Sequence, residues 1–344
     1  MQTLREPAKP GESNSFYRIA VLSVLSLLVG LVTGAAALLF VDSVAWLNRL
    51  LLISPHARIQ HESQPWLVVI APVLVPTLGG LIVGWLIYRV MDERRALGPP
   101  DIIRSVQLRE ELPTARSGLV STLASVVSLG FGASVGQYGP LVYLGALIGS
   151  ACNRLKFAVP NLKSIVIACG VSAAIATAFN APIAGLVFAH EVILRHYSIQ
   201  AFAPTTVAAA SGYIVANVVF DRPPLFLVHF AGVEYGYEFA LFAILGIICA
   251  LLAMLFMRSV ITAGSIAAHI PLHAAFKPAL AGLILGITAM WIPDVLGIGQ
   301  EALRFATIVG KCDHHAGWRR LCDICRKGEF GPRRGGQQRH QTLQ

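Results

Sequence analysis

Long apolar stretches separated by short polar segments make up most of this chain. Several of the stretches are shorter than the roughly 20 residues that a helix needs to cross the hydrocarbon core of a bilayer. Short apolar segments interrupted by glycine or proline are typical of helices that stop at mid-membrane, as in transporters built from inverted repeats. The predicted helical stretches are Tyr17–Leu47, Trp66–Val90, Ala115–Phe131, Pro140–Cys152, Ile165–Phe179, Pro182–Leu194, Phe202–Phe220, Tyr237–Met257 and Pro278–Ile292, followed by a shorter segment at Ala302–Val309.

The composition agrees with a membrane protein. Hydrophobic residues make up 55% of the chain and charged residues 13%, and the mean hydropathy is +0.66. Soluble domains carry about 25% charged residues. We therefore predict an all-α, multi-pass membrane protein. Residues 1–16 are polar and hold no apolar core, so we expect a cytoplasmic N-terminal tail and no cleavable signal peptide.

The positions of the basic residues predict the orientation. Cytoplasmic loops of membrane proteins carry an excess of lysine and arginine. The N-terminal flank and the second predicted loop are the basic ones, which indicates that the N-terminus and the second loop are cytoplasmic. The residues concerned are Arg5, Lys9 and Arg18 in the flank, Arg49 and Arg58 in the first loop, and Arg89, Arg94, Arg95, Arg104 and Arg109 in the second loop.

Two apolar stretches begin with sequences that favour an anion pathway. Residues Gly136–Pro140 read GQYGP, and residues Asn180–Gly185 read NAPIAG. Glycine allows bare backbone to approach an ion, and the first N–H groups of a helix are unpaired and lie at the positive end of its dipole. Irregular backbone within a bilayer persists only where it lines a cavity. The alternative interpretation of GQYGP alone is a turn that starts a membrane helix.

These two segments resemble signature sequences of the CLC family of chloride channels and proton–chloride antiporters, in particular its bacterial ClcB-like branch. The family's G-[KR]-E-G-P corresponds to Gly136–Pro140. Its FNAP-[LI]-AG-x-x-F-x-x-E corresponds to Phe179–Glu191, which is the most specific match. The first family signature, G-S-G-I-P-E, is only faintly present at Ala96–Asp101. The resemblance covers roughly Tyr17 to Gly310.

The resemblance implies the fold, the substrate and the setting of the protein. It implies a CLC-like inverted-repeat helical fold in which residues 17–310 hold the first repeat whole and the second incomplete. It further implies transport of chloride or another small anion by a voltage-gated-type channel, with no enzyme activity, cofactor or metal. A homodimer with one pore per subunit, in the lipid bilayer of the bacterial inner membrane, is the expected assembly.

The resemblance also assigns site residues, and this chain departs from the family at several of them. The gating glutamate falls at Tyr138, the basic residue of the signature at Gln137, and the anion-facing serine at Leu97. The acid of the inner proton route falls at Val192. The expected anion-pathway residues are Gly98, Pro99, Pro100, Gly136, Gln137, Tyr138, Gly139 and Pro140, and Asn180, Pro182 and Glu191 are expected to support the pore.

These departures favour passive conduction, because neither Tyr138 nor Val192 offers a carboxylate to relay protons. Tyr138 either blocks the path with its ring, which we favour slightly, or contacts an anion through its hydroxyl. We expect Gly98–Asp101, Gly136–Pro140 and the Pro182 helix start to converge near the membrane midplane, each with unpaired N–H groups. Glu191 has a structural or a conduction role, and the neighbouring His190 is either cavity-facing or close to the membrane interface.

The last residues, 311–344, match nothing in a membrane domain. They hold eight basic and three acidic residues and several glycines and glutamines. With the third family signature missing, this composition suggests a frameshift or truncation and a tail without a stable fold. Cys312, His314, His315, Cys322 and Cys325 resemble zinc ligands only superficially, and the tail lacks a stacking pattern for nucleic acid. Because the second repeat is incomplete, we expect that this chain by itself does not make a working pore. The alternatives to a chloride channel are a permease of another family or a non-conducting remnant.

Overall fold

The structure is a computed structural model, and it describes residues 12–51, 65–108, 110, 112–152, 161–222, 236–292 and 295–299. All of these residues belong to the first of two units into which the chain divides, residues 1–299. The expected segment Ala302–Val309 and the basic tail at 311–344 lie outside the described residues. So do the first 11 residues of the expected N-terminal tail.

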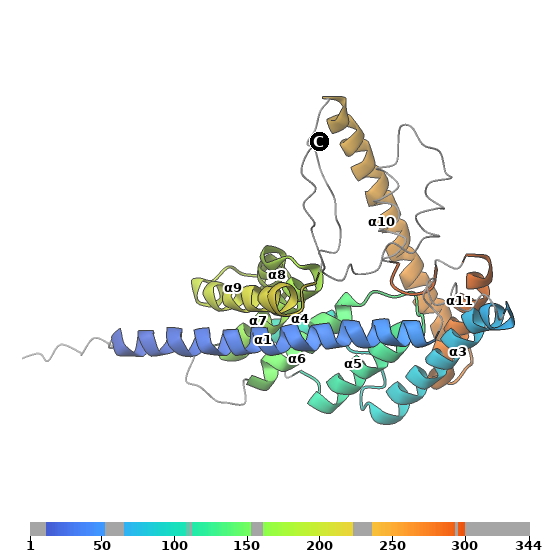
Figure 1. Cartoon of the computed structure of the whole chain (residues 1–344), viewed down its shortest axis with the longest axis horizontal. Helices are drawn as coiled ribbons and strands as arrows, with labels where there is room; N and C mark the ends of the chain where they lie inside the picture. The colour runs from blue at the N-terminus through green and yellow to red at the C-terminus, as the bar shows by residue number, and fades with distance from the viewer. Residues whose placement is uncertain are drawn as a thin grey trace, which may run out of the picture. The chain divides into compact units, whose positions relative to one another are not determined.

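Every regular element of the described residues is helical, as the apolar pattern predicts (Figure 1). Six helices are long and apolar enough to cross a membrane. The elements are α1 (Glu12–Leu50), α3 (Pro65–Val90), α4 (Pro99–Gln107), α5 (Ala115–Gly130), α6 (Tyr138–Cys152), α7 (Leu162–Phe179), α8 (Pro182–Phe188), η2 (Ala189–Leu194), α9 (Ile199–Ile214), η3 (Val215–Val219), α10 (Tyr237–His269), η4 (Ala274–Phe276) and α11 (Lys277–Trp291).

Several elements differ from the sequence expectation, and three of them matter here. Helix α10 continues to His269, beyond the expected end at Met257, because Arg258 and the small polar residues that follow it do not stop a helix. Helix α4 lies in a segment without an apolar stretch and begins at two consecutive prolines, which suit the first turn of a helix. The stretch from Pro182 to Leu194 is α-helical only to Phe188 and then continues as a π-helix.

Helix α7 forms the centre of the core. It packs against α1, α6, α8 and α9, and most of its residues are buried. Helices α6 and α7 run antiparallel and approach each other closely at two glycines. A Cβ atom on Gly170 would lie 1.9 Å from the Gly145 carbonyl oxygen. Small residues let membrane helices pack at this distance, where a side chain would force the two backbones apart.

Helices α3 and α11 form a second antiparallel pair through glycines. A Cβ on Gly80 would lie 2.3 Å from the Pro278 carbonyl oxygen, and one on Gly282 would lie 2.2 Å from the Pro76 carbonyl oxygen. Two prolines inside α3, Pro72 and Pro76, remove backbone donors from the helix, and they face this close contact. The start of α11 therefore lies beside the later turns of α3.

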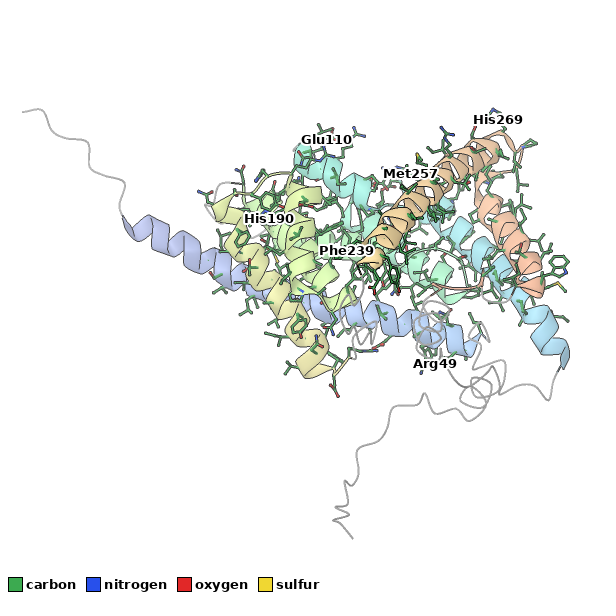
Figure 2. The ribbon with its side chains drawn as sticks, turned by 90° about the horizontal axis from the view of Figure 1, so that it is seen from above. Arg49, Glu110, His190, Phe239, Met257 and His269 are labelled. Atoms are coloured by element: carbon green, nitrogen blue, oxygen red, sulfur yellow. The ribbon has the colours of Figure 1, made fainter. Side chains whose placement is uncertain are left out.

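Helix α10 is the most exposed of the spanning-length helices that the structure describes. It has a mean hydropathy of 2.9 in its most apolar window, and none of its residues is buried. Figure 2 labels Phe239, Met257 and His269 along it. A helix that is apolar all round and unburied is the form expected of a segment surrounded by lipid.

Candidate anion pathway

The start of α4 is closed by its own hydrogen bonds. The Gly98 N–H donates to Asp101 Oδ2 at 2.9 Å, and the Asp101 N–H donates to the Gly98 carbonyl oxygen at 3.0 Å. Arg95 holds the same carboxylate with two hydrogen bonds of 2.5 and 3.2 Å. The Asp101 hydrogen bond, followed by the carboxylate charge, raises the pKa of the Arg95 guanidinium. The Asp101 carboxylate thus caps α4 and accepts the hydrogen bonds of Gly98 and Arg95.

The segment that leads into α4 has no spare donor either. The Leu97 N–H donates to Ser121 Oγ on α5 at 3.0 Å. Pro99 and Pro100 carry no N–H at all. The expectation that this start presents unpaired N–H groups is therefore wrong, because Ser121 and Asp101 accept the hydrogen bonds of Leu97 and Gly98. Neither acceptor stands out in an apolar pattern, although an acid three residues after a helix start is a recognised capping signal.

The start of α6 has the opposite character. Among the described residues, no acceptor contacts the N–H groups of Gly136, Gln137 or Gly139. Gly136 is exposed, and a Cβ on it would meet no atom within 4 Å. The Gln137 side chain is buried, and its Oε1 atom has no hydrogen-bond partner among the described residues. Unpaired N–H groups at the positive end of a helix dipole are an anion-binding arrangement.

Tyr138 packs as a ring among apolar side chains. Its ring stacks on Phe179, with the centroids 4.0 Å apart and the planes inclined by 22°. It also packs against an apolar cluster that includes Phe40 of α1, Leu129 of α5 and Leu141 of α6. The position where the family carries its gating carboxylate is therefore held here by a neutral, half-buried aromatic ring. This packing fits the interpretation of Tyr138 as a plug.

The three helix starts are neighbours, as the sequence led us to expect. A Cβ on Gly139 would lie 3.6 Å from the Pro99 side chain, which brings the α4 and α6 starts together. The Tyr138–Phe179 stack joins the α6 start to the end of α7, immediately before Asn180 and Pro182. Their depth in the membrane stays a prediction.

The turn from α7 to α8 depends on Asn180. Its φ of 57° lies in the left-handed region, which asparagine adopts more easily than most residues. Its N–H and that of Ala181 both bond the Ala176 carbonyl oxygen, and its side chain accepts a hydrogen bond from Asn217 of η3. Pro182 then begins α8 at a position where a missing N–H costs nothing. Asn180 and Pro182 thus shape the turn; that they support a pore stays a prediction.

Val192 and Glu191 lie in the π-helical segment η2, which packs against α4. Val192 is half-buried and packs against a cluster that includes Ile193 and Met91. Glu191 is exposed and accepts a hydrogen bond from the Tyr197 hydroxyl at 3.0 Å. Desolvation, then the hydrogen bond to Glu191 and the charge of that residue, raises the pKa of Tyr197. The contacts of Glu191 are those of a surface residue.

The His190 side chain is wholly buried among other side chains, and its depth in the membrane stays a prediction. Its Nδ1 lies 3.1 Å from the His196 carbonyl oxygen and its Nε2 lies 3.0 Å from Thr205 Oγ1. The imidazole also stacks on Tyr197, with centroids 5.3 Å apart. Figure 2 labels His190 within the group of packed helices. Both ring nitrogens therefore have partners, so the side chain joins η2 to α9.

Sequence reasoning missed Gln107, which stabilises the end of η2. Its Nε2 donates to the carbonyl oxygens of Ile193 and Leu194 at 2.8 and 3.1 Å. Those carbonyls end a helix and need hydrogen-bond donors from elsewhere. The residues are 86 and 87 positions apart in the chain, and no local pattern relates them.

Comparison with known proteins identifies the family. The sequence pattern of the voltage-gated chloride channel family matches residues 79–311, which is more than half of the chain. The chain belongs to the voltage-gated chloride channel (CLC) family. A ClcB-like chloride channel protein of Ralstonia nicotianae is 32% identical over 244 residues, which cover 70% of this chain and 56% of that protein. The ClcB channel of Escherichia coli is 26% identical over 295 residues, 84% of this chain and 68% of that protein. The chain thus spans little more than half of the first relative's length.

Solved structures agree on the fold. A cyanobacterial Cl⁻/H⁺ antiporter superposes with a TM-score of 0.72 at 23% identity, covering 90% of this chain and 71% of the antiporter. A CLC-type fluoride/proton antiporter gives a TM-score of 0.66 at 21% identity, over 84% of this chain and 70% of its own. The all-α CLC fold expected from the sequence is confirmed. Family membership also excludes a permease of another family.

Proposed function

We propose that this chain forms a passive pathway for chloride or another small anion, with its binding site at the start of α6. The supporting observation is the group of N–H donors on Gly136, Gln137 and Gly139, which no acceptor among the described residues contacts. The start of α4 contributes the apolar Pro99 surface beside Gly139 rather than donors. At the start of α6 the helix dipole and the free N–H groups thus both favour an anion.

The proposed gate is the Tyr138 ring, closed by its stack on Phe179. An aromatic pair of this kind contributes about 0.5–1.5 kcal/mol, which corresponds to roughly a two- to tenfold change in the closed-to-open ratio. Tyr138→Ala removes the ring, and we expect chloride efflux from liposomes to rise by that factor. Tyr138→Phe keeps the ring and loses only the hydroxyl, so efflux should stay unchanged.

The same pair of variants separates the two interpretations of Tyr138. If the hydroxyl binds the anion, then Tyr138→Phe lowers efflux and Tyr138→Ala does not raise it. That result would contradict the plug. The control is Tyr197→Phe, which removes a hydroxyl from an exposed ring in the loop before α9. Efflux that is absent from the unmodified chain and from every variant would favour the non-conducting alternative.

Conduction should not be coupled to protons. Positions 138 and 192 hold a tyrosine and a valine, and neither side chain offers a carboxylate to relay protons. A chloride gradient should therefore drive no uphill proton movement in liposomes loaded with a pH dye. Measurable proton uptake would refute this. Tyr138→Glu should make efflux depend on pH.

The setting is part of the proposal. We propose a homodimer in the bacterial inner membrane with a cytoplasmic N-terminus, supported by the family resemblance and by the basic second loop. Cysteine labelling from either side of oriented vesicles, at a residue introduced in the loop after α3, tests the orientation. Crosslinking at low protein density in the same vesicles tests the dimer.

A further inference from the structure

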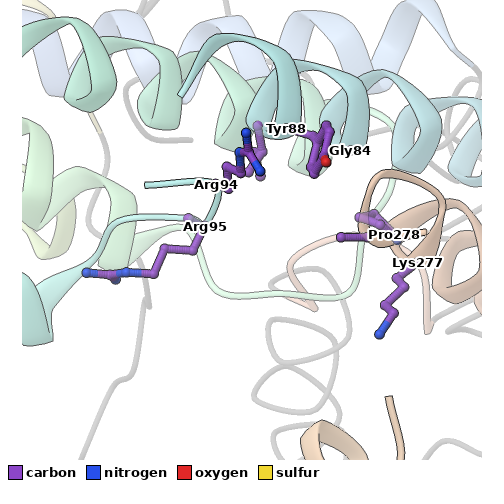
Figure 3. A pocket seen from close by; sticks show the side chains of 9 residues that line it. Gly84, Tyr88, Arg94, Arg95, Lys277 and Pro278 are labelled. Carbon is purple, nitrogen blue, oxygen red and sulfur yellow. The ribbon is translucent and has the colours of Figure 1, made fainter. Parts of the chain in front are cut away.

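A cavity with a basic lining, apart from the proposed pathway, lies at the end of α3. A cavity of about 230 Å³ lies between the last turns of α3, the loop at 94–96 and the start of α11. Figure 3 shows Gly84, Tyr88, Arg94, Arg95, Lys277 and Pro278 around it. All of the charged residues that line it are cations. A cavity of this volume with such a lining suits an anionic group.

The three cations differ in the partners that they already contact. Arg95 is held by Asp101, and Lys277 Nζ donates to the Ala267 carbonyl oxygen at 2.6 Å near the end of α10. The Arg94 guanidinium lies over the Tyr88 ring, 4.9 Å from its centroid. Among the described residues, no carboxylate forms an ion pair with Arg94 or Lys277. These two charges are therefore available to a ligand.

The backbone of Arg94 has an unusual conformation. Its φ of 50° lies in the left-handed region, where a residue other than glycine is strained. Strain of this kind persists only when the surroundings hold the residue, and it recurs at ligand sites. In Figure 3 the Arg94 side chain lies against Tyr88, whereas Arg95 and Lys277 extend in different directions. Arg94 is thus the cation that is fixed at the cavity.

The location of the cavity indicates which anion it takes. Two apolar helices of spanning length, α3 and α11, meet there. We therefore expect the cavity to lie at the level where lipid headgroups begin. The basic residues around α3's end predict that this is the cytoplasmic side. Anionic lipids gather on that side, and basic pockets between membrane helices bind their headgroups. The rings of Tyr88 and His273, 4.5 Å apart, supply the amphipathic rim that suits this depth.

We propose that this cavity binds the phosphate group of an anionic phospholipid, with Arg94 and Lys277 as the cations that contact it. Lys277 is also the first residue of α11, so the positive end of that helix dipole adds to the attraction. Asp92 and Glu93 precede Arg94 and reduce the local charge, but neither lines the cavity. This site is independent of the anion pathway, so either proposal can fail without the other.

Native mass spectrometry of the purified full chain tests the proposal, with phosphatidylglycerol and phosphatidylcholine as the two lipids. We expect tighter binding of phosphatidylglycerol. Each basic residue near an anionic headgroup contributes about fivefold to the affinity. Arg94→Gln should therefore weaken phosphatidylglycerol binding about fivefold and leave phosphatidylcholine unchanged. Arg94→Lys should restore most of the loss.

The matched control is Arg116→Gln, which removes the same charge from an exposed position in the first turn of α5. Equal binding of the two lipids by the unmodified chain would overturn the proposal, as would an equal loss in the control. Soluble glycerol phosphate should compete with phosphatidylglycerol, which would show that the phosphate is recognised. Glycerol phosphate binding without any preference for phosphatidylglycerol would overturn the assignment to a lipid. Unfolding temperatures of the variants, measured in the same detergent, identify any loss that comes from misfolding.

Discussion

The close contact between α6 and α7 predicts that Gly170→Ala destabilises the protein. The new Cβ would lie 1.9 Å from the Gly145 carbonyl oxygen and 2.7 Å from its carbonyl carbon. Both obstructing atoms belong to the backbone, so no side-chain rotation relieves the overlap. An ordinary contact needs about 3.5 Å. The two helices must therefore separate by more than 1 Å at their closest point.

The magnitude follows from what that separation removes. A gap of 0.5–1 Å forfeits about a quarter to a half of the dispersion energy of each contact pair, which is about 0.1–0.2 kcal/mol at its best. For an interface of about 30 such pairs the loss is about 1–3 kcal/mol, which matches the usual cost of overpacking. Alanine also favours a helix over glycine by about 1 kcal/mol, which partly offsets the loss.

A second Gly→Ala variant controls for the gain in helix propensity, because both variants share that gain. Gly246 lies inside α10, and a Cβ on it would meet no atom within 4 Å. Gly246→Ala changes the same residue type within a membrane helix without any overlap. Reversible unfolding in mixed detergent and SDS micelles measures both variants. We expect Gly170→Ala to be less stable than Gly246→Ala by about 1–3 kcal/mol. A difference below about 0.5 kcal/mol would refute the argument from backbone overlap.

Two further predictions concern single buried groups, measured by the same unfolding assay. Gln137→Leu removes the buried Oε1 that lacks a partner, so we expect the free energy of unfolding to stay unchanged or to rise by up to about 1–2 kcal/mol. A marked loss of stability would show that the amide has a partner in the folded protein. His190→Ala removes a fully buried ring with two hydrogen bonds and should cost about 2–4 kcal/mol. Its control Glu191→Gln, at an exposed side chain, should stay within about 0.5 kcal/mol, and equal costs would contradict the burial argument.

The sequence by itself determined the class of fold and the location of the candidate site. Apolar stretches predict the membrane helices because a lipid surrounding selects an apolar side chain at each position separately. That selection can be read residue by residue along the chain. The GQYGP and FNAPIAG segments could be placed at helix starts for a similar reason, since glycine, proline and asparagine act through their own backbone preferences. The length of α10 was misjudged because Arg258 ended the apolar run but not the helix.

Only the tertiary structure decided which helix start keeps free donors. The prolines after Gly98 are evident in the sequence, but Ser121 is not: it lies 24 residues from Leu97 and accepts the N–H of that residue. The burial of His190 and the stack of Tyr138 on Phe179 likewise depend on partners from other helices. A hydrogen bond or a ring contact is formed between groups that packing brings together. The pattern along a single helix therefore does not contain it.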